Sequence, residues 1–145
     1  VVIAIAVIRT LPGPRPDRTI NDPKFEKAAI AICEKEIPKL RAVKREEDTD
    51  DPLEKETAKQ VDEVADELEK IVAKLQALEV RSADQVAVDG WFASYADFIS
   101  AGRHYAEALR GGNEKVYNEV DNEGIKPLEE IRDFGRANHL DACIP

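Results

Sequence analysis

The stretch that decides the fold is Ser82–Gly112, which reads SADQVAVDGWFASYADFISAGRHYAEALRGG. Its apolar residues recur every three or four positions from Val88 to Leu109, which is the spacing of one buried helix face. The stretch holds the single tryptophan, Trp91, with two of the four phenylalanines and two of the three tyrosines. We therefore expect a helix that is capped by Ser82, ends at the paired glycines and is the central packing element.

Two more helical patterns precede this stretch. The first begins at the Asp22-Pro23 pair, which combines a capping side chain with proline at the first helical position. Pro38 should bend this helix, and the acidic connector Glu46–Asp51 ends it. The second begins with the same signal at Asp51-Pro52 and carries an apolar stripe with heptad spacing to about Leu78.

A fourth helix is expected between Asn113 and Asn138. Gly124 and Pro127 should kink or break it near its middle, and Asn138 tolerates a left-handed end. The connections before and after the central helix are only about three residues long, which forces antiparallel neighbours. The sequence therefore predicts an all-α fold, an antiparallel up-down four-helix bundle over residues 22–145 with a kinked fourth helix.

The charge of the chain restricts its partners. The formal net charge is −9, and 35% of the residues are charged. An acidic surface repels nucleic acid and anionic lipid headgroups, so we expect no nucleic acid partner. The densest basic cluster, Lys39–Arg45, runs directly into Glu46 and Glu47 and does not change this expectation.

The first residues form an apolar segment followed by a proline-rich linker. Residues 1–8 read VVIAIAVI, which is shorter than the about 20 apolar residues that cross a bilayer. We interpret residues 1–8 as the end of a transmembrane or apolar anchor segment; the alternative is a segment packed on the domain. In residues 9–21, alternate prolines hold the backbone extended, which predicts a spacer between the anchor and the bundle.

The two cysteines, Cys33 and Cys143, lie near opposite ends of the chain. A disulfide between them would close a loop of about 110 residues and stabilise the fold by about 4–5 kcal/mol in the chain-entropy model. Such bonds persist outside the cytosol. The alternative is two reduced cysteines, one in the core and one on a tail; a free cysteine is a normal core residue. We favour the disulfide, because a thiol on a short tail is a liability unless it is tied down.

These features resemble small exported helical proteins of actinobacteria. The resemblance rests on the proline-rich spacer, the single cysteine on the first helix and the closing pattern of residues 134–143, FGRANHLDAC. It covers most of residues 20–145. It implies an exported helical bundle and carries over no functional residue, because no activity is established for such proteins. The chain lacks a lipobox cysteine near its start, which favours a transmembrane tether.

No motif for catalysis, a cofactor or a metal stands out. His104 with Glu107 has the helical spacing of half a metal site, but a solvated or hydrogen-bonded histidine is the more common case, and His139 suits a helix C-terminus. No serine lies in a Gly-x-Ser-x-Gly motif, and the acidic connector lacks the glycine and glutamate of an EF-hand loop. We therefore expect no enzyme, no cofactor and no metal.

Two places with small or missing side chains are candidates for contact with a partner, because the backbone there can be approached closely. These are the small-residue step Ala101-Gly102 and the predicted kink at Gly124–Pro127. The aromatic stripe of the central helix is interpreted as core rather than as a ligand groove; it comprises Trp91, Phe92, Tyr95, Phe98 and Tyr105.

Together these features predict a non-enzymatic helical interaction domain. We expect it to be single-pass anchored on the extracytoplasmic face of a bacterial cell membrane, as an accessory subunit of a membrane protein complex. The alternative is an extracytoplasmic helical module that binds a small ligand or a metal.

Overall fold

The computed structural model describes residues 19–43, 55–112 and 114–145, and every regular element within these ranges is helical. The predicted all-α class is confirmed for this part of the chain. The elements are α1 (Pro23–Ala42), α2 (Lys55–Gln76), α3 (Gln85–Gly111), α4 (Glu114–Val120), α5 (Ile125–Ala137) and the short 3-10 helix η1 (Asp141–Cys143).

Several predictions fall outside the described residues. They concern the apolar segment at residues 1–8, most of the linker at residues 9–21, the acidic connector and the helix start at Asp51-Pro52. Of the predicted linker, Thr19–Asn21 are described. The backbone N–H of Ile20 donates to Oδ1 of Asn138 at 2.7 Å, so the end of the linker is bound to the helices.

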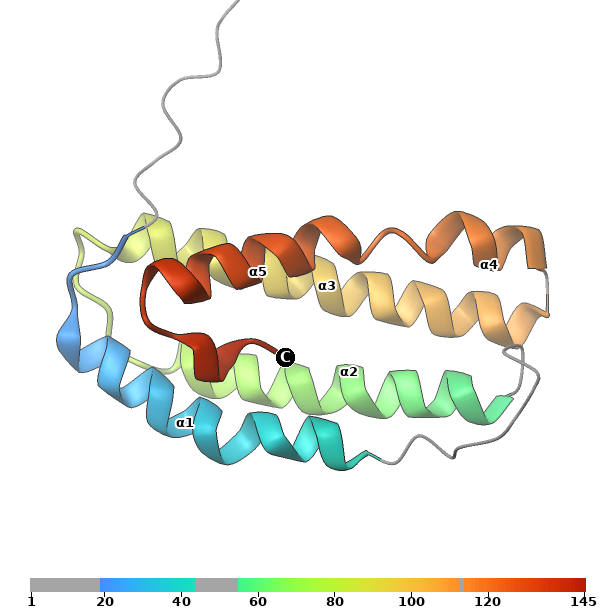
Figure 1. The fold of residues 1–145 in the computed structure, drawn as a ribbon, viewed down its shortest axis with the longest axis horizontal. Coiled ribbons are helices and arrows are strands. Elements are labelled where there is room, and N and C mark those ends of the chain that lie inside the picture. Colours follow the sequence, from blue (N-terminus) through green and yellow to red (C-terminus); the bar gives the residue numbers. More distant parts are fainter. Residues whose placement is uncertain (1–18, 44–54, 113) are drawn as a thin grey trace, which may run out of the picture.

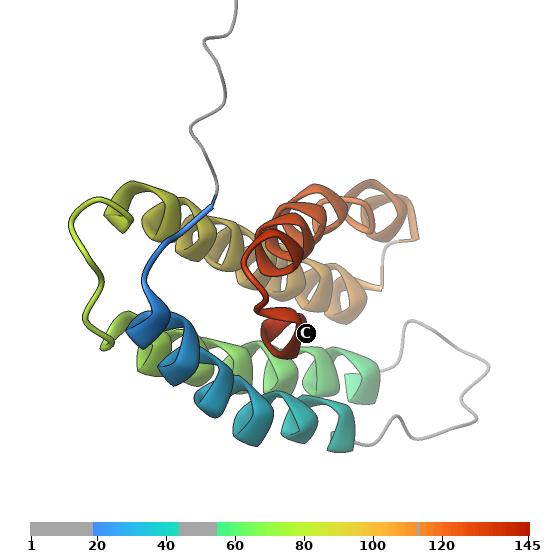
Figure 2. The same ribbon diagram turned by 60° about the vertical axis from the view of Figure 1, so that its left-hand side comes forward.

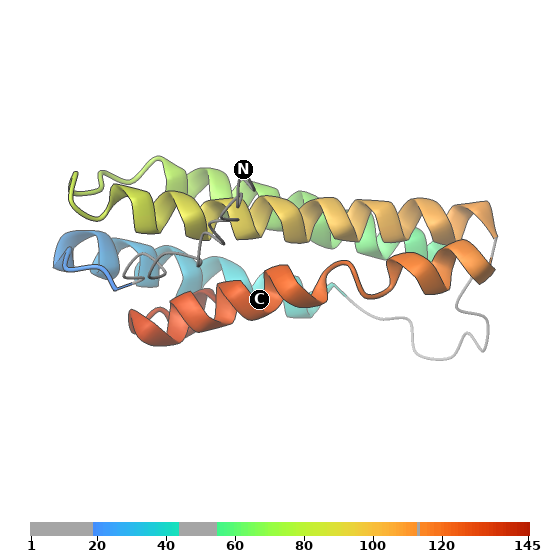
Figure 3. The ribbon, with the colours of Figure 1, turned by 90° about the horizontal axis from the view of Figure 1, so that it is seen from above.

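The central helix is α3, as the sequence predicts. It packs against α2, α4 and α5, and it runs alongside α2 in the opposite direction (Figures 1 and 3). α1 packs against α2. The tail returns as η1, which contacts both α1 and α5 and lies between the α1–α2 pair and the α3–α5 pair (Figure 2). The described elements thus form a helical bundle in which η1 bridges α1 and α5.

Asp22 caps α1 as the sequence predicts. Its Oδ1 accepts hydrogen bonds from the N–H groups of Lys24 and Phe25 at 3.2 and 3.1 Å, and its Oδ2 accepts one from the N–H of Arg81 at 2.9 Å. The bond from Phe25, followed by the bond from Arg81, lowers the pKa of the Asp22 carboxyl. One carboxylate therefore fixes the start of α1 and the loop between α2 and α3.

The start of α3 differs from the prediction. Residues 82–84 form a turn, and the helix begins at Gln85 with Asp84 at the cap position. Ser82 is therefore not the cap that the sequence predicts. The Asp84 side chain makes no capping bond: its Oδ1 accepts a hydrogen bond from the N–H of Asn21 at 3.2 Å, and its buried Oδ2 has no hydrogen-bond partner among the described residues.

The end of α5 also differs from the prediction. The left-handed residue is His139, with φ 57°, whereas Asn138 has φ −121°. The Asn138 amide instead donates to the carbonyl of Phe134 at 2.9 Å and accepts from the N–H of Ile20. Because Asn138 is used in this way, the turn falls on the next residue.

The predicted fourth helix is present as α4 and α5, joined by the turn at residues 121–124. Gly124 ends this turn, and a Cβ atom there would lie 3.5 Å from the ring of Phe98 on α3. Pro127 lies within the first turn of α5, where its missing N–H costs no helical hydrogen bond. A side chain at this position would therefore make ordinary van der Waals contact with α3.

The main core is built around Trp91, which is 2% exposed. Its ring stacks on Phe92 and Phe134, with centroids 5.5 and 4.9 Å away, and meets Phe25 and Tyr95 edge to face. These aromatic contacts join α1, α3 and α5 around one side chain. Aromatic pairs of this kind add about 0.5–1.5 kcal/mol each beyond the area that they bury.

Candidate functional site

The two cysteines meet in the core. The Sγ atoms of Cys33 and Cys143 are 2.06 Å apart and their Cα atoms 4.9 Å apart, which links α1 to η1 across a sequence separation of 110. Both residues are buried. The structure thus brings together the pair that the sequence singled out; the oxidation state of the native protein stays a prediction.

The same turn is held from two other helices. The Tyr95 hydroxyl on α3 donates a hydrogen bond to the carbonyl of Cys143, and burial raises the pKa of this phenol. On α5, a Cβ atom at Gly135 would lie 3.2 Å from Ile144 and 3.3 Å from the carbonyl oxygen of Leu140. A glycine therefore occupies the place where the tail passes closest to α5.

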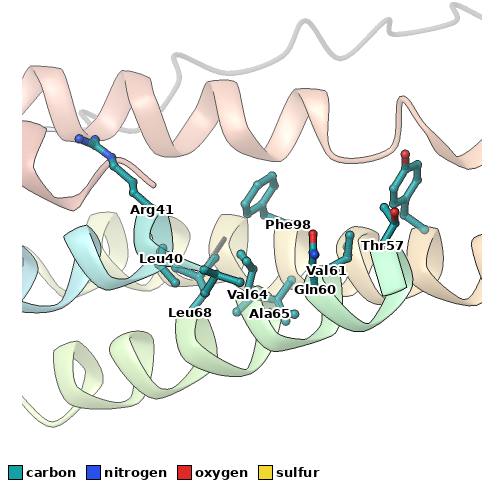
Figure 4. A pocket seen from close by; sticks show the side chains of 13 residues that line it. Leu40, Arg41, Thr57, Gln60, Val61, Val64, Ala65, Leu68 and Phe98 are labelled. Atoms are coloured by element: carbon teal, nitrogen blue, oxygen red, sulfur yellow. The ribbon is translucent and has the colours of Figure 1, made fainter. Parts of the chain in front are cut away.

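An apolar groove with a volume of about 860 Å³ opens beyond the end of α1 (Figure 4). Its floor is formed by α2 and α3, and the labelled side chains of these helices lie below the ribbon of the C-terminal helices in this view. The lining residues are Leu40, Arg41, Val43, Thr57, Gln60, Val61, Val64, Ala65, Leu68, Phe98, Ile99, Gly102 and Tyr105. A smaller hollow of about 190 Å³ shares Phe98, Gly102 and Tyr105 and extends to Val120, Asp121 and Gly124.

The groove exists because α1 is shorter than the two helices beneath it. In the half of the molecule around the disulfide, α1, η1 and α5 cover α2 and α3. α1 ends at Ala42, whereas α2 and α3 continue further. Along this remaining length, the described element that packs beside them is α4. Val61, Val64, Phe98 and Tyr105 are therefore only partly buried.

Both floor helices present their groove residues with heptad spacing. The rows are Thr57, Val61, Val64 and Leu68 on α2, and Phe98, Gly102 and Tyr105 on α3. Steps of four and three are the spacing at which one helix packs its side chains against another. The two helices that line the groove thus carry the same repeat, although their chain directions are opposite.

The opposite side of the α2–α3 pair is closed by ion pairs. Arg103 lies 2.9 Å from Asp66 and 2.8 Å from Glu69, and Arg110 pairs with Asp62. The hydrogen bond that Arg103 donates to Asp66 is the main cause that raises the pKa of the Arg103 guanidinium. Because these charges lie on the outer side, Arg41 is the single charged residue among the described residues that line the groove.

Glu36 is a nearly buried carboxylate at the α1–α2 contact, with a side chain only 7% exposed. It accepts a hydrogen bond from Lys39 at 2.6 Å and pairs with Lys74 of α2 at 2.9 Å. The bond from Lys39, followed by that from Lys74, lowers the pKa of Glu36 to about 2. Among the described residues its partners are these two lysines, and the pair with Lys74 ties α1 to α2.

The histidines lie apart from these features. Nδ1 of His104 is 3.0 Å from Oε2 of Glu123, so its partner is not the Glu107 considered from the sequence. His139 is exposed in the turn after α5. Within the described ranges, no three His, Cys, Asp or Glu side chains lie close enough together to hold a metal ion.

In the part of the chain that the structure describes, no helix is both long and apolar enough to span a membrane. Comparisons with protein-family models, with curated proteins and with solved structures give no match.

The aromatic stripe divides between two environments. Trp91, Phe92 and Tyr95 are core, as predicted, whereas Phe98 and Tyr105 line the groove. The small residues expected at the surface are near the same place, since Ala101, Gly102 and Gly124 line the smaller hollow. The sequence pattern did not predict the groove, because the core part and the groove-lining part of the stripe carry the same apolar repeat. The two parts differ only in whether they lie before or beyond the end of α1.

Proposed function

We propose that this chain is a non-enzymatic helical interaction domain that serves as an accessory subunit of a membrane protein complex. The observation that carries the proposal is the apolar groove along α2 and α3, where four side chains of core type are only partly buried. Contiguous apolar surface of this kind marks a site of interaction with another molecule. The absence of catalytic motifs in the sequence also favours a binding role.

We further propose that the domain lies on the extracytoplasmic face of a bacterial cell membrane and is held there by a single N-terminal segment. Support comes from the Cys33–Cys143 geometry, because a disulfide persists in an oxidising compartment. The apolar residues 1–8 and the proline-rich linker after them supply the material for an anchor and a spacer.

The arrangement and directions of the helices are part of the same proposal. We propose an antiparallel up-down four-helix bundle in which α4 and α5 together are the kinked fourth helix. The opposite directions of α2 and α3 and the glycine junction at Gly124 support this arrangement. A distance map from pairs of spin labels on α1, α2, α3 and α5 tests it; parallel α1 and α2 would contradict it.

The location is tested in bacterial cells that express the full chain. We expect the protein in the membrane fraction, digestible by protease added to intact cells, and without reactive thiols until it is reduced. A variant with Ile3, Ile5 and Val7 changed to Ser should leave the membrane fraction while the domain stays folded. A cytosolic protein with two free thiols would contradict the proposal.

A second candidate function is binding of a small apolar ligand in the same groove. Its volume lies within the roughly 300–1,000 Å³ that ligand sites usually occupy, and its lining is mainly apolar. Native mass spectrometry of the purified protein tests this candidate. A mass equal to that of the chain alone, after isolation without detergent, would count against it.

A further inference from the structure

We propose that the groove binds one α-helix of a partner protein, and that this helix is amphipathic, net basic and apolar at heptad spacing. The inference rests on the proposed role as an interaction domain and states which surface carries that role and what it recognises.

The shape of the groove favours a helix as the occupant. From Thr57 to Leu68 it follows α2 for about 16 Å, which is about three helical turns. An apolar row on each wall would receive the side chains of a further helix between its own, as in a coiled coil. A flexible hydrocarbon chain would need no such repeat on both walls.

Gly102 supplies the space for close approach. It lies in the middle of α3, where glycine destabilises a helix relative to alanine. A Cβ atom at this position would contact only Cγ1 of Val61, at 3.9 Å, so nothing within the described fold requires the glycine. An incoming helix backbone would use the room that the missing side chain leaves.

The negative charge of the chain favours a basic partner. The net charge of −9 attracts a basic helix over long distances, and Asp121 at the α4 side of the adjoining hollow adds a local negative charge. Arg41 at the α1 end of the groove is placed to pair with a carboxylate at one end of that helix. The connecting sequence of residues 44–54, KREEDTDDPLE, has Leu53 and Pro52 as its only apolar residues and cannot supply a heptad row.

The test compares two identical substitutions on one helix. Gly102→Leu fills the groove, whereas Gly90→Leu adds the same side chain at an exposed position of α3 with no atom within 4 Å of its Cβ. Circular dichroism and thermal melting establish that both variants fold. Val64→Gln, which changes the α2 wall at a partly buried position, is the second variant if Gly102→Leu does not fold.

The probe is a synthetic peptide of about three heptads, with Leu at every a and d position and Lys at the outward positions. A scrambled peptide of the same composition lacks the heptad spacing. Both are labelled with a fluorophore and titrated with the full chain at about 0.15 M salt, where non-specific attraction is screened within roughly 8 Å.

We expect the unchanged chain and Gly90→Leu to bind the heptad peptide equally. Gly102→Leu should bind it about tenfold more weakly or worse, and the scrambled peptide should not bind. Equal binding of the two peptides, or equal binding by Gly102→Leu and Gly90→Leu, would overturn the proposal.

Two further outcomes would assign the groove to another occupant and also overturn it. One is a dimer of the unchanged chain, seen by sedimentation velocity, that becomes a monomer in Gly102→Leu. The other is tighter peptide binding when Ile3 and Ile5 are changed to Asp, which would mean that the apolar N-terminal run competes for the groove. The peptide assay uses purified protein and does not depend on where the protein lies in the cell. The peptide proposal can therefore fail while the membrane location holds, and the membrane location can fail while the peptide binds.

Discussion

At the scale of single residues, two carboxylates tie neighbouring elements together. Asp22 bonds the start of α1 and the loop after α2, and Glu36 joins α1 to Lys74 in the last turn of α2. Each accepts more than one hydrogen bond, and each has a lowered pKa. Stability should therefore depend on their ionisation, and Glu36 offers the clearer case because its pKa falls furthest.

We predict that the stability contributed by Glu36 is lost in acid. Its pKa falls from the ordinary value of 4.5 to about 2 in the folded state, so its contribution is complete above pH 4.5 and disappears as the pH falls towards 2. Glu36→Gln should lower the urea midpoint at pH 7 and flatten its decline between these two pH values. Urea titrations across this range measure both effects.

The matched control for this prediction is Glu34→Gln, an exposed change on the same helix. It should leave the pH profile of the unchanged chain intact. If Glu36→Gln and Glu34→Gln gave the same profile, the ion pairs with Lys39 and Lys74 would not contribute to acid stability.

At the scale of elements, η1 is a three-residue turn held by its attachments. A covalent bond to α1, a hydrogen bond from Tyr95 and close packing on Gly135 keep it between two helices. A helix this short has no stability of its own in water. The bridge therefore decides whether the tail stays in the core.

We predict that changing both Cys33 and Cys143 to Ala lowers the free energy of unfolding by about 4–5 kcal/mol, because the unfolded chain regains the freedom of a loop of about 110 residues. Reduction of the unchanged chain should have a similar effect. Urea unfolding with and without reductant measures both. Asp141→Asn, an exposed change in the same turn, should unfold like the unchanged chain; an equal midpoint for the double variant would show that the bridge adds no stability.

Local sequence patterns predicted the helical elements well and their junctions less well. The Asp22-Pro23 start and the central role of α3 follow from local signals that the structure keeps. The predicted Ser82 cap of α3 was wrong: the helix begins at Gln85, and the Asp84 side chain before it bonds to Asn21, 63 positions away in sequence. The left-handed turn was displaced from Asn138 for the same kind of reason, since a distant N–H at Ile20 occupies its side chain.

The groove was beyond the reach of these patterns. A heptad row on α2 predicts that something covers it, but not whether the cover belongs to the same chain. The extent of cover depends on where α1 ends relative to α2 and α3, which is a property of three elements together.

At the scale of the whole molecule, the two ends of the α2–α3 pair differ in how much core they contain. The aromatic core around Trp91 lies at one end, and a small cluster of Ala58, Ala106 and Leu109 lies at the other. Regions with few buried apolar contacts open locally at lower free energy. The groove end should therefore be the less stable part of the pair.

We predict that backbone amides at residues 58–64 and 103–109 exchange with solvent faster than those at residues 88–95, although all lie within helices. Hydrogen exchange followed by mass spectrometry measures the difference. The heptad peptide should slow exchange at the groove end selectively, and uniform protection along α3 would contradict this view of the molecule.

The single indole makes the molecule its own optical reporter. Trp91 touches rings from three helices and is almost fully shielded from water, so its emission should shift to longer wavelength as soon as those helices separate. Separation of these helices can thus be followed by colour in the unaltered protein, without attaching any dye.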